Sequence, residues 1–191
     1  MNTSKSYNVW LKTAYKLFAE KGPENFSIKE VAKLSGLPRT NFYYYFDNKD
    51  DLLDKTIDLH FQSTTEIYNA ELSKRLNTFI PDLYEVIYDF KLGVQFAKTL
   101  FKHRDIPKYN TAYIKGTTLS VDLVVPKFKE FFNINLPDEQ VKELYLTLTD
   151  TWYSRLNFNN YSVEYLCELC FEIMVTLTPL IELSNTQGKV I

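Results

Sequence analysis

Hydroxyl, guanidinium and amide side chains are concentrated in one short stretch, SGLPRTNFYYYFDNK, which spans residues 35–49. An arginine there could bind O6 and N7 of guanine through two parallel hydrogen bonds, and an asparagine could pair with adenine. Tyrosine hydroxyls can donate hydrogen bonds to phosphate oxygens without carrying a charge. The residue types therefore predict contacts with DNA, or alternatively a dense corner of a hydrophobic core.

Helices must position these groups, because apolar residues before them recur at helical spacing. Residues 10, 14, 17 and 18 form one apolar stripe, and Gly22-Pro23 ends that helix. A second helix is expected to start at Ser27, whose hydroxyl can cap the amide of Glu30. Phe26 and Val31 flank this cap with the spacing of a hydrophobic staple, so two independent signals predict the same boundary.

The third predicted helix is short, covers residues 38–45 and follows a turn at Gly36. Pro38 suits its first turn, and Phe42 and Phe46 should face inward because they are four residues apart. Tyr45 is left as either a core or a surface residue. Asp47 or Asn48 should cap a fourth helix with an apolar stripe at 53, 57, 60 and 61. A helix, a tight glycine turn and a second short helix form a helix-turn-helix, whose second helix enters the major groove.

The charge is unevenly distributed along the chain. Residues 1–46 carry seven basic and three acidic side chains, a net charge of +4, whereas the whole chain of 191 residues carries −2 and the remainder therefore −6. A basic head on an acidic body favours a nucleic-acid partner for the head alone.

Three blocks of residues in the first third of the chain have a joint spacing that is specific. They read Ala14-x-x-Leu17-Phe18-x-x-x-Gly22, Ser27-Ile28-x-x-Val31-Ala32, and Gly36-Leu37-x-x-x-x-Phe42-Tyr43-x-Tyr45-Phe46-x-x-Lys49-x-x-Leu52-Leu53. Over about residues 8–60 the sequence resembles the TetR family of transcriptional regulators. The resemblance implies an all-α homodimer with a helix-turn-helix DNA-binding domain (1–47) and a helical ligand-binding and dimerisation domain (48–191).

The resemblance also implies roles for particular residues of the head. Ser27, Tyr43 and Lys49 should contact phosphates, and the stretch 38–44 should read bases. Pro38 departs from the family pattern, which often has a small hydroxyl residue there, and this puts one phosphate contact in doubt. The expected DNA-binding residues are Ser27, Pro38, Arg39, Thr40, Asn41, Tyr43, Tyr44 and Lys49.

The body is predicted to be a helical bundle. One apolar stripe runs from Leu83 to Phe101 and a second face carries Leu92, Phe96 and Leu100, which predicts a single central helix buried on several sides. Pro107, Pro126 and Pro137 should separate further helices. The last two helices, 137–158 and 162–183, would pair with their copies in a family dimer, although their stripes could also only close the monomer core.

The resemblance further implies a small effector, and the sequence suggests a lipophilic or aromatic one. Ordinary core packing is the alternative for each candidate ring. The candidate ligand-binding residues are His60, Thr64, Tyr88, Phe101, His103 and Tyr113.

Other chemistry is not expected. Cys167 and Cys170 lie in a periodic helix, and the two histidines, His60 and His103, are far from them, so no metal site is predicted. No nucleotide-binding or hydrolase motif is present, which predicts neither a cofactor nor an enzyme. Two cysteines and the lack of an apolar leader or membrane-length run predict a cytoplasmic protein without a membrane partner.

The expected function is that of a transcriptional regulator, most simply a repressor released from its operator by the effector. A homodimer would place two recognition helices about 34–36 Å apart on a near-palindromic stretch of double-stranded DNA. The alternative is a helical adaptor or co-activator that keeps the fold but acts through protein contacts. The intact Ser27, Tyr43 and Lys49 of the basic head favour DNA.

Overall fold

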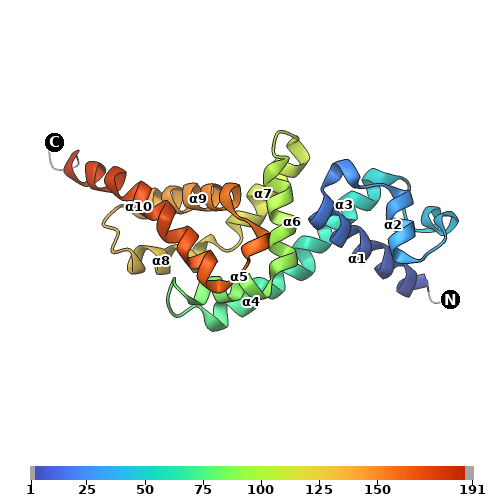
Figure 1. Cartoon of the computed structure of the whole chain (residues 1–191), viewed down its shortest axis with the longest axis horizontal. Helices are drawn as coiled ribbons and strands as arrows, with labels where there is room; N and C mark the ends of the chain where they lie inside the picture. Colours follow the sequence, from blue (N-terminus) through green and yellow to red (C-terminus); the bar gives the residue numbers. More distant parts are fainter. Residues whose placement is uncertain (1–2, 188–191) are drawn as a thin grey trace. The chain divides into compact units, whose positions relative to one another are not determined.

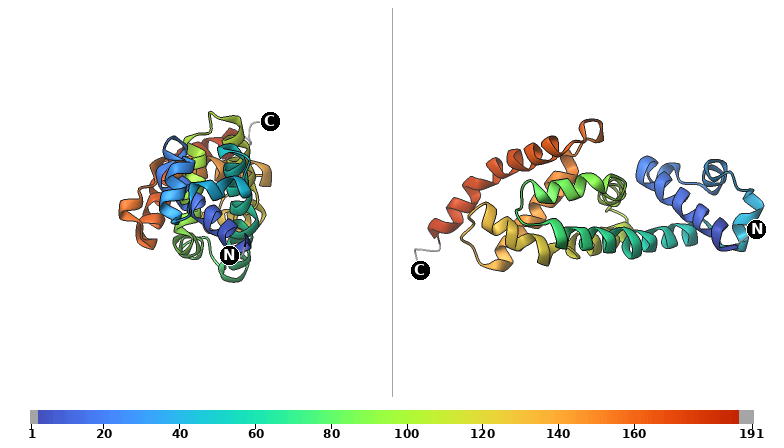
Figure 2. Two further views of the ribbon diagram at one scale, coloured as in Figure 1. Left: turned by 90° about the vertical axis from the view of Figure 1, so that its right-hand side faces the viewer. Right: turned by 90° about the horizontal axis from the view of Figure 1, so that it is seen from below.

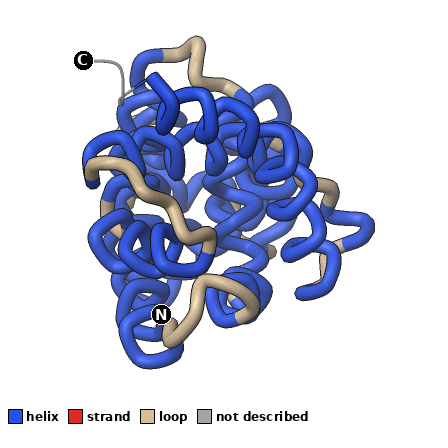
Figure 3. The backbone as a smooth tube through the Cα atoms, turned by 90° about the vertical axis from the view of Figure 1, so that its left-hand side faces the viewer, coloured by secondary structure: helices blue, strands red, loops and turns tan. Residues whose placement is uncertain are grey.

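The computed structural model describes the backbone of residues 3–187 and the side chains of residues 5–62 and 65–179. Within these residues every regular element is a helix and no strand occurs, which confirms the all-α prediction (Figure 3). Helices cover the chain almost without long loops (Figure 1). None of the described helices combines the length and the hydropathy needed to cross a membrane.

The chain folds into two compact units that differ from the expected functional domains. The first unit contains residues up to 67 together with 91–116, and the second contains 68–90 together with the chain from 117 onward. The expected division at 47/48 is a division by function and stays a prediction. Packing alone assigns the helices of residues 91–116 to the same unit as the predicted helix-turn-helix.

The first unit is built around α1, which packs against α2, α3 and α6. Two predicted glycine turns are confirmed, because Gly22 and Gly36 have φ angles of 75° and 68°, in the region that favours glycine. The elements of this unit are α1 (Thr3–Lys21), η1 (Pro23–Asn25), α2 (Ile28–Ser35), η2 (Arg39–Tyr44), α3 (Lys49–Leu59), the π-helical η3 (His60–Thr65), the start of α4 (Glu66–Arg75), α6 (Lys91–Lys102) and most of α7 (Pro107–Thr118).

Aromatic rings form the core of the first unit. Phe96 of α6 stacks on Tyr15 with 4.5 Å between ring centroids and lies 4.7 Å from Phe18, both on α1. Phe18 also contacts Phe26 and Tyr109, so α1, the start of α2, α6 and α7 share one core. Burial of such large rings supplies most of the stabilising free energy.

The second unit consists of the rest of α4, α5 (Asp82–Asp89), α8 (Val121–Phe131), α9 (Asp138–Arg155), η4 (Phe158–Asn160) and α10 (Val163–Gln187). Helix α9 lies between α8 and α10 and contacts both, while α10 also contacts α5 (Figures 1 and 2). Phe79 and Phe128 are fully buried with their ring centroids 5.2 Å apart. Leu148 and Leu166 are also buried and bring α9 and α10 into the same core.

The prediction of one long helix across residues 83–101 is wrong. The helix breaks at Phe90, which has φ −98° and ψ 28°, and the two halves, α5 and α6, belong to different units. The apolar periodicity did not reveal the break, because Phe90 is itself apolar and the apolar spacing continues on both sides of it. The second face is also only partly buried, since Phe96 and Leu100 are buried but Leu92 is 37% exposed.

Pro126 does not separate two helices as expected, because it lies inside α8. Its side chain is exposed, so the hydrogen bond that its missing amide removes lies on the solvent side of the helix, where water can satisfy the freed carbonyl. Pro107 and Pro137, by contrast, stand at the starts of α7 and α9 as predicted.

Candidate nucleic-acid interface

The turn between α2 and η2 is fixed by local hydrogen bonds. Ser27 caps α2 by accepting a hydrogen bond from the amide of Glu30 at 3.2 Å, as predicted. At the other end, the hydroxyl of Ser35 donates to the carbonyl of Ala32 at 3.0 Å and accepts from the amide of Leu37 at 3.3 Å. Sequence reasoning missed Ser35, although a serine directly before the helix-ending glycine is a recognisable signal.

The predicted third helix is a 3-10 helix rather than an α-helix. Its turns close through hydrogen bonds from the amide of Asn41 to the carbonyl of Pro38 and from the amide of Tyr45 to the carbonyl of Phe42, both at 2.9 Å. Side chains three residues apart eclipse one another in this geometry. Thr40 and Tyr43 therefore share one edge of η2, and its short length presents several polar groups on a small surface.

Phe42 and Phe46 anchor η2, as their spacing predicted. Both are buried, and the ring of Phe42 lies 5.4 Å from Trp10 of α1 and 5.2 Å from Phe46. Tyr45 is half-buried, with its ring 6.1 Å from Tyr7, so it packs on the core side. The anchored face leaves the opposite face of η2 free for another molecule.

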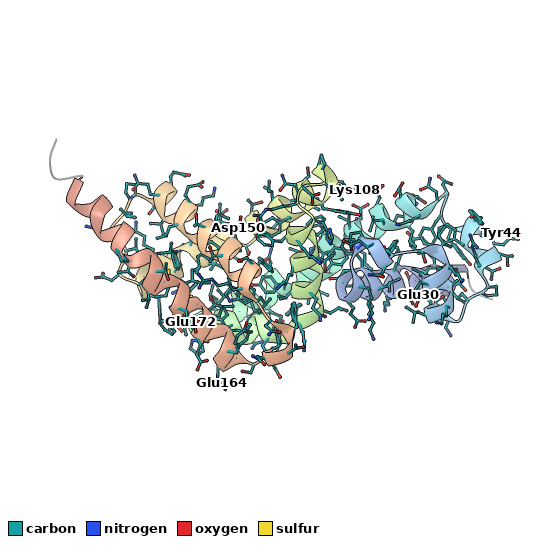
Figure 4. The ribbon with its side chains drawn as sticks, turned by 45° about the horizontal axis from the view of Figure 1, so that its top comes forward. Glu30, Tyr44, Lys108, Asp150, Glu164 and Glu172 are labelled. Carbon is teal, nitrogen blue, oxygen red and sulfur yellow. The ribbon has the colours of Figure 1, made fainter. Side chains whose placement is uncertain are left out.

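The solvent-facing side of η2 carries the groups that were expected to contact DNA. Tyr43 is 62% exposed and Tyr44 is 81% exposed, an unusual degree for large aromatic side chains. Pro38, Arg39 and Thr40 are exposed as well, whereas Asn41 is half-buried. Figure 4 shows Tyr44 projecting away from the ribbon into solvent. Exposed rings with polar tips on a rigid element suit recognition.

Ser27 and Lys49 stand at the starts of two helices, α2 and α3. Asn48 caps α3 by accepting hydrogen bonds from the amides of Asp50 and Asp51 at 2.8 and 3.0 Å, and Lys49 is the first residue of that helix. The ammonium of Lys49 lies 5.9 Å from the ring centroid of Phe26, the residue before Ser27. A helix N-terminus favours a nearby anion, and the phosphate contacts expected of Ser27 and Lys49 stay a prediction.

One of the acidic side chains near Lys49 is already engaged. The carboxylate of Asp51 bonds to Lys55 and accepts a hydrogen bond from the amide of Asp47 at 3.0 Å. The contact with Lys55 is the main reason that the pKa of Asp51 lies below its usual value. Its charge is therefore largely balanced within α3 and repels a bound phosphate less than a free carboxylate would.

The six candidate effector residues do not all lie in one unit. His60, Phe101 and Tyr113 are buried in the first unit, where His103 is half-buried and its Nε2 lies 3.4 Å from Oε1 of Glu24. Tyr88 is 45% exposed and belongs to the second unit. The side chain of Thr64 lies outside the described residues. Their role as ligand contacts stays a prediction.

His60 is held as a neutral core residue. The hydroxyl of Tyr15 lies 2.8 Å from its Nδ1, and its ring stacks on Phe96 with centroids 4.6 Å apart. Burial lowers the pKa of His60 to about 4, because the charged imidazolium would lose its hydration. Phe101 and Tyr113 contact each other edge to face at 5.3 Å, which is also ordinary core packing.

The sequence pattern of the family described as "Bacterial regulatory proteins, tetR family" matches residues 11–56, the stretch that forms this interface. Over these residues the chain is similar to the TetR family of transcriptional regulators. The chain is 22% identical over 155 residues to the negative transcriptional regulator IcaR of the biofilm operon icaADBC of Staphylococcus aureus, covering 78% of this chain and 83% of the relative. It is 25% identical over 157 residues to IcaR of Staphylococcus epidermidis, with the same coverage.

A solved structure shows the same fold for the regulator as a whole. A transcriptional regulator from Aquifex aeolicus superposes with a TM-score of 0.60 at 19% identity and covers 90% of this chain and 99% of its own. The likeness in fold therefore extends beyond the N-terminal pattern to the helical body.

Proposed function

We propose that this regulator is a sequence-specific DNA-binding repressor that acts through the exposed face of η2. The observation that carries the proposal is the division of this short helix into a buried face and an exposed polar face. Phe42 and Phe46 fix its orientation, while Arg39, Tyr43 and Tyr44 face solvent. The two IcaR relatives are negative regulators, which supports repression rather than activation.

Each polar group of the interface has a distinct part in the proposed complex. Ser27 and Lys49 hold a phosphate at the starts of α2 and α3, and Tyr43 donates its hydroxyl to a phosphate. Arg39, Thr40 and Asn41 lie where base edges would pass, with Arg39 suited to guanine and Asn41 to adenine. Pro38 and Tyr44 flank these residues and pack against the sugar-phosphate backbone.

A homodimer would present two copies of η2 to a near-palindromic operator about one DNA turn apart. The exposed apolar side chains of α10 support a dimer through the two C-terminal helices. Phe171 is 44% exposed and Val175 is 73% exposed, and their spacing of four residues puts them on one side of the helix. An apolar stripe of this kind is covered when a second copy packs against it.

Release from the operator would follow from an effector that binds one arrangement of the dimer better than the other. The change in DNA affinity then equals the difference in effector affinity between the two arrangements. A small lipophilic or aromatic molecule is the expected class, and the cytoplasm is the expected compartment. No cofactor has a part in this function.

The test begins with selection of bound duplexes from a random pool by the purified full chain. A palindromic consensus is expected, and its affinity should fall steeply with salt because phosphate contacts release counterions. The Tyr43→Phe and Lys49→Ala double variant should then bind the consensus at least tenfold more weakly, since hydrogen bonds to charged groups contribute about 1.5–3 kcal/mol each. Loss of Lys49 should also lower the salt slope by about 1 per protomer.

Matched controls separate contact from folding. Tyr88→Phe and Lys102→Ala remove the same groups from exposed positions outside the interface and should leave DNA affinity unchanged. All variants should keep the circular dichroism and melting temperature of the wild type. Equal binding by the double variant and the wild type would contradict the residue assignment, and a folded protein that selects no sequence would favour the adaptor hypothesis.

A further inference from the structure

One acidic side chain stands among the residues that are proposed to contact DNA. Asp47 is exposed and lies in the short connection between η2, which ends at Tyr44, and α3, which begins at Lys49. Two residues of chain span at most about 7 Å, so the Cα atoms of Asp47 and Lys49 are no farther apart than that. This separation is shorter than the screening length of about 8 Å at physiological ionic strength. A phosphate held by Lys49 would therefore lie within the field of the Asp47 carboxylate.

The two other acidic side chains next to Lys49 are engaged elsewhere. Asp51 forms an ion pair with Lys55 on the following turn of α3. Asp50 lies toward α7, because the pKa of Tyr109 is raised by burial first and then by the charge of Asp50. Neither of these carboxylates is left to act on DNA alone.

Asp47 differs from them, because it has no cation at close range. Among the side chains that the structure describes, no lysine or arginine nitrogen lies within 4 Å of its carboxylate. The pKa of Lys55 is raised chiefly by its hydrogen bond with Asp51, and the charge of Asp47 is the smallest of the causes. The hydrogen bond of 3.0 Å that joins Asp47 to Asp51 is donated by the backbone amide of Asp47. Its carboxylate is therefore exposed and without an ion-pair partner.

An unbalanced carboxylate at this place opposes the binding of a polyanion. Attraction between basic side chains and phosphates supplies essentially all of the binding to random DNA, and it does not depend on the base sequence. A negative charge on the same surface reduces this attraction. Repulsive groups of this kind are a general means by which proteins gain specificity, since they act against the unwanted partner.

The strength of the repulsion should depend on where the phosphates lie. In the proposed operator complex Ser27, Tyr43 and Lys49 hold phosphates at fixed positions. In a complex that is held only by charge the protein slides along the duplex, so phosphates also pass directly beside the exposed carboxylate of Asp47. The Coulomb energy rises as the distance between two charges falls, and these other registers are therefore disfavoured more strongly.

We propose that Asp47 is a specificity-determining residue, which weakens the binding of random DNA more than it weakens the binding of the operator. It acts by repelling phosphates and contacts no base, in keeping with its place after η2, since recognition helices contact base edges with their first residues. The inference rests on the proposed function, because it requires a DNA-binding surface around Lys49. It gives Asp47 an effect opposite in sign to that of every DNA contact expected there.

The test is Asp47→Asn, which removes the charge but keeps the shape of the side chain and the backbone hydrogen bond to Asp51. Affinities of the purified full chain for the selected operator and for a random duplex of equal length are measured by fluorescence anisotropy. Charges about 4 Å apart in water interact by the equivalent of about fivefold in affinity, and charges about 8 Å apart by about twofold. The variant should bind random DNA about fivefold and the operator about twofold more tightly per protomer. The ratio of the two affinities should therefore fall.

Two further variants separate this effect from a general change in charge. Asp58→Asn removes an exposed carboxylate from the same helix, about 13 Å from Lys49 along the axis and beyond the screening length, and should change neither affinity. Asp47→Glu keeps the charge and should preserve the wild-type ratio. Damage to the fold would weaken DNA binding, whereas the expected result is tighter binding.

The other outcomes would overturn the inference. Equal tightening of both duplexes would remove the selective role, and an unchanged affinity for random DNA would place Asp47 away from the phosphates. Weaker binding of the operator alone would make Asp47 a base contact instead. A wild type that binds the selected and the random duplex equally would overturn the proposed function together with the inference, whereas a selective wild type whose ratio Asp47→Asn leaves unchanged would overturn the inference alone.

Discussion

The two units of the molecule use tyrosine in opposite ways. In η2 of the first unit, Tyr43 and Tyr44 are 62% and 81% exposed, while in the second unit Tyr84 is only 3% exposed and its ring lies 6.2 Å from Trp152. The difference comes from neighbouring residues, since the phenylalanine anchor of η2 already fills the core there. The comparison teaches that the tyrosine content alone indicates neither a core nor a binding surface.

The largest effect is expected when a buried phenylalanine that anchors η2 is removed. Phe42→Ala should lower the free energy of unfolding by about 3–5 kcal/mol, because it leaves a cavity beside Trp10 and Phe46. Tyr44→Ala, two residues away and exposed, should change it by less than about 0.5 kcal/mol. Urea unfolding measures both, and similar values for the two variants would show that η2 is not anchored as described.

Tyr15 is a case between the exposed and the buried tyrosines, because its hydroxyl lies beside a polar partner, His60, that is itself buried. Because the pKa of His60 is lowered from 6.5 to about 4, its contribution to stability is complete above about pH 6.5 and is lost as the pH falls toward 4. The loss should reach about 3 kcal/mol, at 1.36 kcal/mol per pKa unit.

The measurement is urea unfolding from pH 7 to 4 for the wild type and for His60→Gln, which keeps a hydrogen-bond acceptor but does not titrate. As the pH falls from 7 to 4, the free energy of unfolding should drop by about 3 kcal/mol less in the variant than in the wild type. Parallel curves for the two proteins would contradict the buried, neutral state of His60.

Unfolding at alkaline pH tests whether the hydroxyl of Tyr145 is shielded from water. The pKa of Tyr145 is raised from 10.0 to about 12, so its contribution to stability is complete below pH 10 and is lost as the pH rises toward 12. The stability lost should be about 2.7 kcal/mol more for the wild type than for Tyr145→Phe. A Tyr145→Phe curve identical to that of the wild type would place the Tyr145 hydroxyl in water.

The smallest expected effect concerns Ser27, whose hydroxyl has two proposed uses. Ser27→Ala removes the cap of α2 and should lower the free energy of unfolding by about 1 kcal/mol, whereas Ser27→Gly should cost only a few tenths. Both should lose the phosphate contact and weaken operator binding to a similar extent. If DNA affinity instead follows stability across the two variants, Ser27 acts only as a cap.

The sequence correctly predicted those element boundaries that are determined by contacts between residues close together in the chain. The cap at Ser27, the turn at Gly36 and the start of α3 depend on residues within four positions, and all three are confirmed. The break at Phe90 was missed because an apolar residue at the right spacing hides it. Pro126 was misread because the cost of proline depends on which side of the helix is exposed, and the sequence does not show this.

The same distinction between local and long-range contacts applies to the packing of individual side chains. The orientation of η2 was predictable from the spacing of Phe42 and Phe46, but the position of Tyr45 depends on its contact with Tyr7, 38 residues earlier. The packing of Tyr145 of α9 against Phe128 of α8 was not predicted at all, because the two residues lie on different helices.

The packing of α1 against α6 also limits how this protein can recombine with its relatives. Tyr15 and Phe18 share one core with Phe96 and Tyr109, so the region that matches the family pattern is not a self-contained module. A chimera that exchanged only residues 1–47 would separate Tyr15 and Phe18 from Phe96 and Tyr109, their partners in this core. If η2 reads the operator as proposed, we expect operator specificity to be exchanged more readily by substitutions on the exposed face of η2 than by swapping this whole segment.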